Sequence, residues 1–169
     1  MKRILTDAPD LPGATGAVAK EREGASVLKA VVGNGKGGRV VVMDSITQLM
    51  PEDAWAVVVS ASHGGVSSGE IALGQPLAAA FFNDAGVGKD NAGIAALEML
   101  QREGVAAGTV SHTSARIGDG ADMWSNGVIS HVNQAARLLG LKPGSGLRAV
   151  LVDLVSREAF EHRPATPAP

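Results

Sequence analysis

The chain has 169 residues, contains no cysteine and no tyrosine, and is only 3% aromatic. Without cysteine it has no disulfide, no thiolate nucleophile and no cysteine-bound zinc. With so few aromatic side chains it also lacks the stacking surfaces on which RNA-binding proteins hold bases. Apolar residues still make up 45% of the chain, so the core must rely on close packing of small side chains. Such packing suits tightly apposed strands and helices, and it suits contacts between subunits.

Strong charge and long apolar runs are missing as well. The formal net charge is only −2, so no basic field attracts nucleic acid. No apolar run approaches the roughly 18 residues of a membrane span. The N-terminal sequence MKRILTDAPDLPG has only Ile4 and Leu5 where a signal peptide has its apolar region. We therefore expect a cytoplasmic protein that binds neither nucleic acid nor membranes.

The length predicts one domain, which we place at residues 1–161. Residues 1–25 show no clear periodicity and are interpreted as a loose arm or an edge element. The final stretch from His162, HRPATPAP, is rich in proline, so residues 162–169 are expected to be a disordered tail.

Short continuous apolar runs predict strands that are covered on both faces. There are five such runs, at residues 39–43, 55–60, 77–82, 105–110 and 147–155. Helical signals fall between several of them. The alternation predicts a single α/β domain with a mostly parallel sheet of about five strands and helices packed on it.

Three helices are expected from capping residues and apolar spacing. Ser67 and Glu70 form the capping-box pattern that opens a short helix. Asp90 is interpreted as the N-cap of a helix over 91–103, and a last helix is predicted over 122–139 with Gly127 as a weak point. The polar residues at helical spacing in this last segment are interpreted as its solvated face; they are Asn126, Ser130, Asn133 and Arg137.

Four of the five apolar runs end in small polar or ionisable residues. These are Asp44 and Ser45, then Ser62 and His63, then Asn83 and Asp84, and finally Ser111, His112, Thr113, Ser114 and Arg116. Parallel strands bring their carboxyl ends to one edge of a sheet, where ligands bind in open α/β folds. The sequence therefore predicts a ligand site at this edge. The alternative is that loops after strands are ordinarily polar.

The stretch FFNDAGVGKDNAG, residues 81–93, resembles a phosphate-binding loop only in part. A nucleotide-binding loop of the Walker type requires glycine where Asn83 stands and serine or threonine where Asp90 stands. We therefore reject that function for the stretch.

The same stretch still predicts ligand contacts. Gly86 and Gly88 allow backbone N–H groups to approach a ligand, and Lys89 adds a positive charge. Asn83 is predicted to bind an oxyanion and Asp84 to act as a general acid or base. The alternative is that Asp84 only pairs with Lys89.

Residues 60–70, SASHGGVSSGE, supply the second candidate group. His63 can exchange a proton near neutral pH, and Ser62 is a candidate ligand contact. The segment GGVSSGEIALGQPLAAAF resembles, over some fifteen residues, the Gly-Gly-x-Thr-Ser-His segment of phosphohistidine swivelling domains. Gly69 stands where that family has its phosphorylated histidine, so phosphotransfer is not implied. The layered β/β/α arrangement of that family is kept as an alternative fold.

Residues 111–127, SHTSARIGDGADMWSNG, supply the third group of candidate site residues. Arg116 can bind a carboxylate or phosphate through two parallel hydrogen bonds. Asp119 is a candidate for acid–base chemistry and Ser114 for ligand binding. The alternative is an ion pair between Arg116 and Asp119 that fixes the loop.

These residues favour an enzyme that acts on a small anionic metabolite by acid–base chemistry, as a hydrolase, a lyase or an isomerase. The alternative is a non-catalytic module for ligand binding or oligomeric assembly, and a homo-oligomer fits both. No cofactor is predicted. No metal site is predicted either, because His63, Asp84, His112 and Asp119 lack the spacing of known metal motifs.

Overall fold

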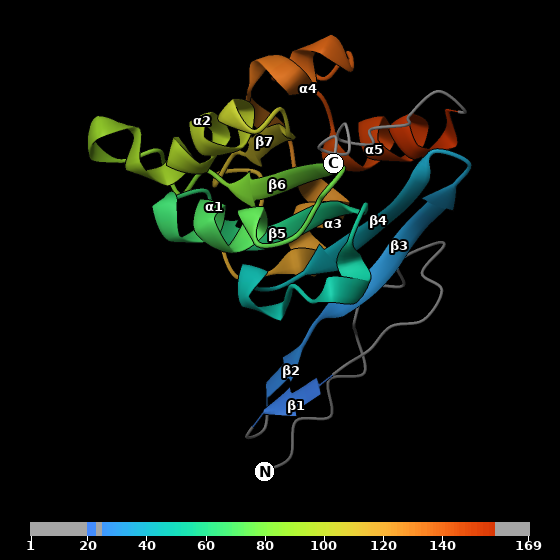
Figure 1. Cartoon of the computed structure of the whole chain (residues 1–169). Helices are drawn as coiled ribbons and strands as arrows, with labels where there is room; N and C mark the ends of the chain where they lie inside the picture. Colours follow the sequence, from blue (N-terminus) through green and yellow to red (C-terminus); the bar gives the residue numbers. More distant parts are fainter. Residues whose placement is uncertain (1–19, 23–24, 158–169) are drawn as a thin grey trace, which may run out of the picture.

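A computed structural model describes residues 20–22 and 25–157 (Figure 1). The expected C-terminal tail and most of the expected N-terminal arm lie outside these residues. Within them, β1 (Lys20–Arg22) and β2 (Ala25–Val27) pair as a small antiparallel sheet.

The main sheet has six strands in the order β3-β4-β5-β6-β7-β8. Their bounds are Lys29–Gly35, Gly38–Met43, Val57–His63, Ala79–Asn83, Ala106–Val110 and Ile129–Val132. The four central strands are parallel, and the edge strands β3 and β8 are antiparallel to their neighbours. The predicted single α/β domain with a mostly parallel sheet is thus confirmed, with β3 and β8 as strands that the sequence analysis did not anticipate.

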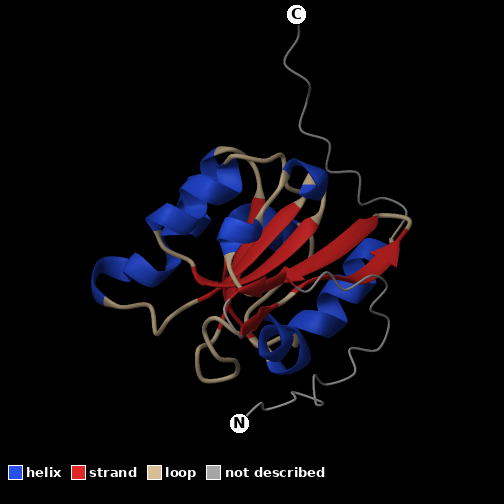
Figure 2. Ribbon diagram, turned by 90° about the horizontal axis from the view of Figure 1, so that it is seen from below, coloured by secondary structure: helices blue, strands red, loops and turns tan. Residues whose placement is uncertain are grey.

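Helices lie on both faces of this sheet (Figure 2). The core on one face joins it to α1 (Val66–Leu73) and α2 (Ala95–Arg102). The core on the other face joins it to α3 (Gly120–Asn126) and α5 (Leu147–Ser156), and it includes Ala136 of α4 (Gln134–Leu138). Short 3-10 helices lie in the connections after β4 and β6. They are η1 (Ile46–Gln48), η2 (Pro51–Asp53) and η3 (Lys89–Ile94). The β/β/α arrangement of swivelling domains is therefore not the arrangement of this chain.

The apolar runs become central strands because both of their faces are buried. In β4, Val40 and Val42 belong to the core under α3 and α5, whereas Val41 and Met43 belong to the core under α1 and α2. This explains why the runs are continuous rather than alternating with polar residues. None of the helices in the described part of the chain has the length and apolar character needed to cross a membrane.

The fifth predicted strand, at 147–155, is wrong, because this run forms the helix α5. Leu147, Leu151 and Leu154 are buried, whereas Val152 is 45% exposed. Spacings of four and three residues place the buried side chains on one helical face. A short apolar run does not distinguish a buried helix from a buried strand, so the packing decided between them.

The single helix predicted over 122–139 is also wrong, since the chain forms α3, β8 and α4 there. Gly127 ends α3 in an extended conformation, and a Cβ there would lie 2.3 Å from the Met123 carbonyl oxygen. Asn133 then begins α4 by accepting a hydrogen bond from the Ala136 N–H at 3.0 Å. Ser130 therefore lies on a strand rather than on a solvated helix face.

Two predicted helix caps are wrong as well. The helix α1 begins at Val66 with Gly65 as N-cap, so Ser67 lies inside it. Asp90 has a φ of 55° inside η3, and α2 begins only at Ala95. The four residues between the expected and observed starts belong to η3, and among them the Gly93 N–H donates to the Val87 carbonyl at 2.6 Å.

The helical assignment of 147–156 has a direct test. Replacement of Leu151 by alanine should lower the free energy of unfolding by about 2–5 kcal/mol, because a fully buried side chain is lost. Val152→Ala should change it by less than about 0.5 kcal/mol, since this side chain is exposed. Urea unfolding of both variants measures the difference, and equal losses would show that the run packs as a strand buried on both faces.

Candidate functional site

The carboxyl ends of β5, β6 and β7 lie at one edge of the sheet, as the sequence predicts, because the three strands are parallel neighbours. His63 at the end of β5 pairs in register with Asn83 at the end of β6. The Asp84 N–H donates to the Val110 carbonyl of β7 at 2.9 Å. His112 follows β7 by two residues, so four of the polar residues gather around the end of β6.

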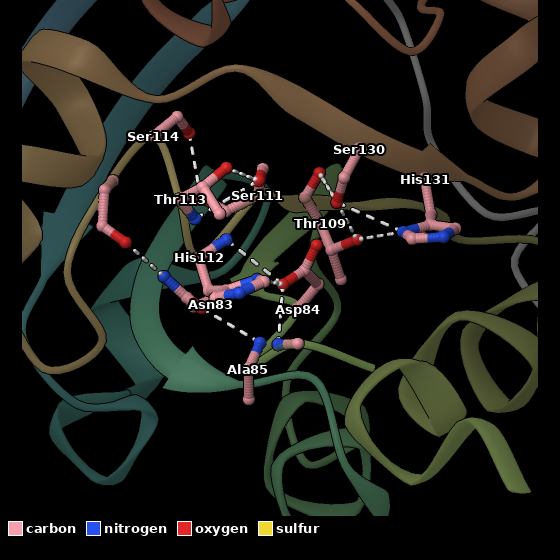
Figure 3. A network of polar contacts seen from close by, with 12 residues as sticks. Asn83, Asp84, Ala85, Thr109, Ser111, His112, Thr113, Ser114, Ser130 and His131 are labelled. Atoms are coloured by element: carbon pink, nitrogen blue, oxygen red, sulfur yellow. Dashed lines mark hydrogen bonds and ion pairs between the residues drawn. The ribbon is translucent and has the colours of Figure 1, made fainter. Parts of the chain in front are cut away.

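The central contact joins the Asp84 carboxylate to His112. Asp84 Oδ1 lies 3.0 Å from His112 Nδ1 and accepts from the N–H groups of His112 and Gly86 at 3.1 and 2.9 Å (Figure 3). Asp84 is 4% exposed, whereas the His112 side chain is 53% exposed. The partner of Asp84 is thus His112 and not Lys89, and the pair couples a buried carboxylate to an imidazole that reaches solvent.

Two opposing effects act on the Asp84 carboxyl. Its burial by itself raises the pKa. The hydrogen bonds from the Gly86 N–H, the Ser130 hydroxyl and the N–H and ring of His112 outweigh this and hold the pKa below its ordinary value of 3.8. Asp84 is therefore ionised at neutral pH, and the His112 proton lies on Nδ1, facing it. The Nε2 lone pair of neutral His112 is directed away from Asp84.

Asn83 uses both ends of its side-chain amide to position loops. Its Nδ2 donates to the Ala115 carbonyl at 2.9 Å, and its Oδ1 accepts from the Ala85 N–H at 2.9 Å. The side chain is fully buried. Asn83 thus connects the loop after β6 to the loop after β7, and the structure gives it a positioning role where the sequence suggested an oxyanion contact.

The loop after Asp84 has a rare backbone conformation. Six of its residues have positive φ: Ala85, Gly86, Val87, Gly88, Asp90 and Asn91, with values from 51° to 76°. Val87 is the central residue of a γ-turn, in which the Gly88 N–H donates to the Gly86 carbonyl at 2.8 Å. Such a conformation costs about 1–3 kcal/mol at each non-glycine residue and is concentrated at functional sites.

Two glycines let neighbouring segments approach this loop. A Cβ on Gly93 would lie 2.2 Å from the Asp84 carbonyl oxygen, and one on Gly64 would lie 2.8 Å from the Gly93 carbonyl oxygen. Side chains at these positions would separate η3 and the start of α1 from the end of β6. The glycines thus hold the strained loop against the site.

His63 is the second exposed imidazole at this edge. Its Nδ1 accepts from the Gly65 N–H at 3.0 Å, so in the neutral ring the proton lies on Nε2. His63 therefore presents a donor, whereas neutral His112 presents an acceptor. The adjacent Ser62 has a structural contact instead. Its hydroxyl accepts a hydrogen bond from the Ile46 N–H at 3.0 Å and so holds the start of η1.

A hydroxyl and imidazole cluster beside Asp84 was missed as a functional feature. Ser130 Oγ lies 3.0 Å from Thr109 Oγ1 and 3.1 Å from His131 Nδ1, and Thr109 Oγ1 lies 3.3 Å from the same nitrogen (Figure 3). The sequence VISHV at 128–132 did contain a signal, because three of its five residues are β-branched, and such residues favour a strand. His112 was noted in the sequence, but only the structure shows that it contacts Asp84.

The remaining predicted residues are farther along the loops. Ser114 donates to the Ser111 carbonyl at 2.8 Å and accepts from the Val128 N–H at 2.9 Å. Asp119 is the N-cap of α3 and accepts from the Asp122 N–H at 2.9 Å. No contact within the described residues joins Asp119 to Asp84 or His112, so its catalytic role stays a prediction. Gly86, Gly88, Lys89 and Arg116 are all exposed.

Arg116 does not form the alternative ion pair with Asp119 within the described residues. Its N–H donates to Asp122 Oδ2 at 2.9 Å. The pKa of Asp122 is lowered chiefly by the hydrogen bond from Asn126, with smaller contributions from the Arg116 N–H and its charge. The carboxylate that interacts with Arg116 is therefore Asp122.

Asp44, after β4, has a structural role. Its two carboxylate oxygens accept from the N–H groups of Gly120 and Leu28, each at 2.8 Å. They fix the start of α3 and the segment entering β3. Of the four polar strand ends, the one after β4 therefore has a carboxylate whose hydrogen bonds stabilise the fold.

A groove of about 710 Å³ lies away from this edge, among β3, α3 and α5. Trp124, Arg148 and Val152 are among its lining residues, and none of the predicted site residues is. The Arg148 guanidinium lies 6.0 Å from the centre of the Trp124 ring. The groove and the polar edge are thus separate features.

Comparison with protein-family models, curated proteins and solved structures found no match to this chain. Within residues 27–157, whose side chains the structure describes, no group of three or more histidine, aspartate or glutamate residues is placed to hold a metal ion.

The lowered pKa of Asp84 predicts a specific pH dependence of stability. A carboxyl whose folded-state pKa is depressed stabilises the fold above its unfolded pKa, and this contribution is lost as the pH falls through 3.8 and toward the folded value. Asp84→Asn should therefore be less stable than wild type at pH 7, with a smaller difference at pH 3. Urea unfolding across this range measures it. Glu70→Gln removes an exposed charge as the control, and an unchanged difference across the range would contradict the assignment.

Proposed function

We propose that the protein is an enzyme that performs acid–base chemistry on a small anionic metabolite, with His112 as the group that exchanges the proton. The observation that carries the proposal is the hydrogen bond from His112 Nδ1 to the buried Asp84 carboxylate. A carboxylate in this position fixes the imidazole tautomer, orients the ring and stabilises the imidazolium that forms when Nε2 takes up a proton. Asp84 is thus an orienting group rather than the base itself.

His63 complements His112 as a proton donor. The two residues come from β5 and the end of β7, with β6 between them. Neighbouring strands lie about 4.8 Å apart, so the strand ends are separated by about 10 Å. A metabolite of a few carbon atoms fits this span. His112 would remove a proton from one position, and His63 Nε2–H would donate to an oxygen at another.

Positively charged side chains near the site favour an anionic substrate. Lys89 and Arg116 are exposed on the loops that follow β6 and β7. Asp84, the carboxylate that contacts His112, is buried. Gly86 keeps space at the ring, since even an added Cβ would lie 3.6 Å from His112 Cε1. A substrate carboxylate or phosphate would therefore meet positive charge at the rim of the site.

The contacts of His112 also limit which types of reaction fit the site. No hydroxyl of the described residues contacts His112 Nε2, so the arrangement lacks the hydroxyl member of a Ser-His-Asp triad. Proton transfer directly to or from the substrate fits a lyase or an isomerase, and proton transfer from water fits a hydrolase. A covalent serine intermediate is not part of this proposal.

The second candidate function is an assembly module, and α1 favours it. Val66, Ile71 and Leu73 are 54%, 37% and 38% exposed. Exposed apolar side chains on one helix are typical of subunit contacts when they form a continuous patch. A homo-oligomer is compatible with the enzyme as well, and light scattering after size-exclusion chromatography would measure it.

A thermal-shift screen with small carboxylates, sugar phosphates and inorganic phosphate should identify the ligand class. A ligand at 100 times its Kd stabilises the folded state by about 2.7 kcal/mol, which raises the Tm by several degrees. The shift should shrink in Lys89→Ala and in Arg116→Ala, and it should persist in the control Lys36→Ala on the distant β3–β4 turn. Equal shifts in all three variants would place the anion elsewhere.

With a substrate of that class, His112→Gln should lower kcat by about 10²- to 10⁴-fold, the usual contribution of a general acid–base group. Asp84→Asn should also lower kcat, because the asparagine amide does not stabilise the imidazolium. Steady-state kinetics measures both changes, and Gln134→Ala at the exposed start of α4 is the control. A His112→Gln variant with wild-type kcat would exclude His112 from the reaction.

A further inference from the structure

The groove that β3, α3 and α5 line has no part in the proposed reaction, and its surface is mostly apolar. Val128 and Val152 line it and are 37% and 45% exposed. Exposed apolar side chains in a groove gain free energy when an apolar ligand covers them. The lining runs along α5 from Gly146 to Ser156, which is about 15 Å at the helical rise per residue. The groove therefore has the shape for an extended apolar chain.

The amino end of α5 opens into this groove. Gly146, its N-cap, and Ala149, in its first turn, both belong to the lining. No side chain caps this end of the helix. The Leu147 N–H donates to the Gly127 carbonyl at 2.9 Å, but the Ala149 N–H has no partner that the helix itself can supply.

The space beside this helix end is open. A Cβ added to Gly146 would meet no heavy atom of a more distant residue within 4 Å. The amino end of a helix carries about half a positive charge, and its N–H groups point outward, so it attracts anions. An anion in the groove can therefore approach the first turn of α5.

Trp124 gives a second, independent indication of a hydrogen-bond acceptor. It lies on α3, lines the same groove and is 1% exposed. Its indole Nε1 is the only buried side-chain nitrogen or oxygen of the described residues that has no hydrogen-bond partner. A buried donor without an acceptor costs free energy, and a buried tryptophan N–H usually has one. An acceptor atom of a ligand would satisfy it.

Arg148 places these two features at the same end of the groove. It belongs to the first turn of α5, and its guanidinium carbon lies 6.0 Å from the centre of the Trp124 ring. Among the described residues that line the groove, Arg148 is the only one with a charged side chain, so no lining carboxylate repels an anion. The helix end, the guanidinium and the indole N–H all favour an anion with acceptor oxygens.

We propose that this groove binds a medium-chain carboxylate, the anion of a fatty acid such as octanoic or decanoic acid. The carboxylate accepts hydrogen bonds from the Ala149 N–H and Trp124 Nε1. Because Arg148 lies over the indole ring, its side chain turns aside and pairs with the same carboxylate. The acyl chain then extends along α5 and covers Val128 and Val152. This site is separate from the polar edge of the sheet and does not rest on the proposed function.

Calorimetric titration of the full chain with octanoate measures this binding. Acetate lacks the acyl chain and n-octanol lacks the charge, so each should bind at least about tenfold more weakly than octanoate. Octanoate should also change the fluorescence of Trp124 in a Trp55→Phe variant, where Trp124 is the only tryptophan. An affinity for n-octanol equal to that for octanoate would contradict the anion site.

Two substitutions at Gly146 test the helix end. Gly146→Asp supplies a carboxylate from the chain itself, which caps α5 and occupies the place of the ligand carboxylate. It should raise the Tm of the unliganded protein and weaken octanoate binding at least about tenfold. Gly146→Ala is the matched control, because its Cβ enters open space and brings no carboxylate. It should keep the octanoate affinity of the wild type.

Two further substitutions test the side chains. Arg148→Gln and Trp124→Phe should each weaken octanoate binding roughly tenfold, because each removes a donor to the carboxylate. Neither should change the weaker binding of n-octanol. If Trp124→Phe fails to fold, Arg148→Gln and the two Gly146 variants still decide the question.

The groove and the polar edge are tested by different variants. Octanoate affinity should be the same in the wild type, Lys89→Ala and Arg116→Ala, whatever the fate of the proposed enzyme. No binding of octanoate to the wild type, or binding that neither Arg148→Gln nor Gly146→Asp weakens, would overturn the proposal. An octanoate affinity that rises as the protein is diluted would overturn it too, because a second copy of the chain would then occupy the groove.

Discussion

The hydrogen bonds to the Asp84 carboxylate hold the site together. Buried just after β6, this carboxylate accepts from the Gly86 N–H and from both the N–H and the ring of His112. These donors come from two segments, the loop after β6 and the loop after β7. A buried charge is tolerated only when it is satisfied in this way, so the same bonds that stabilise Asp84 also fix the geometry of the site.

The strained loop after Asp84 follows from that constraint. Ala85 and Gly86 turn back so that their N–H groups reach the side chains of Asn83 and Asp84. The chain then needs left-handed backbone at Val87, which a β-branched residue adopts only when its surroundings impose it. The close approach of Gly93 supplies that support, since its N–H donates to the Val87 carbonyl at 2.6 Å. Strain and support together favour a functional origin of this loop over an ordinary turn.

Imidazole placement gives the site its chemical character. His63 and His112 lie on either side of β6 and are held through Nδ1 in opposite ways, one accepting and the other donating. The result is one exposed donor and one exposed acceptor at the same edge. His131 Nδ1 contacts the hydroxyls of Ser130 and Thr109, where the pairing of β7 with β8 shifts register.

By itself the sequence determined the α/β class, the four parallel strands and the edge at which polar residues gather, because continuous apolar runs and the polar residues after them are local features. Tertiary structure decided what local patterns leave open. The run at 147–155 forms a helix that packs one face on the sheet, and residues 129–132 form a strand because they pair with the edge of β7. Asp84 and His112 are 28 positions apart, and their contact arises only from the register of β6 and β7. Contacts of this kind depend on how strands align, and no local spacing encodes that alignment.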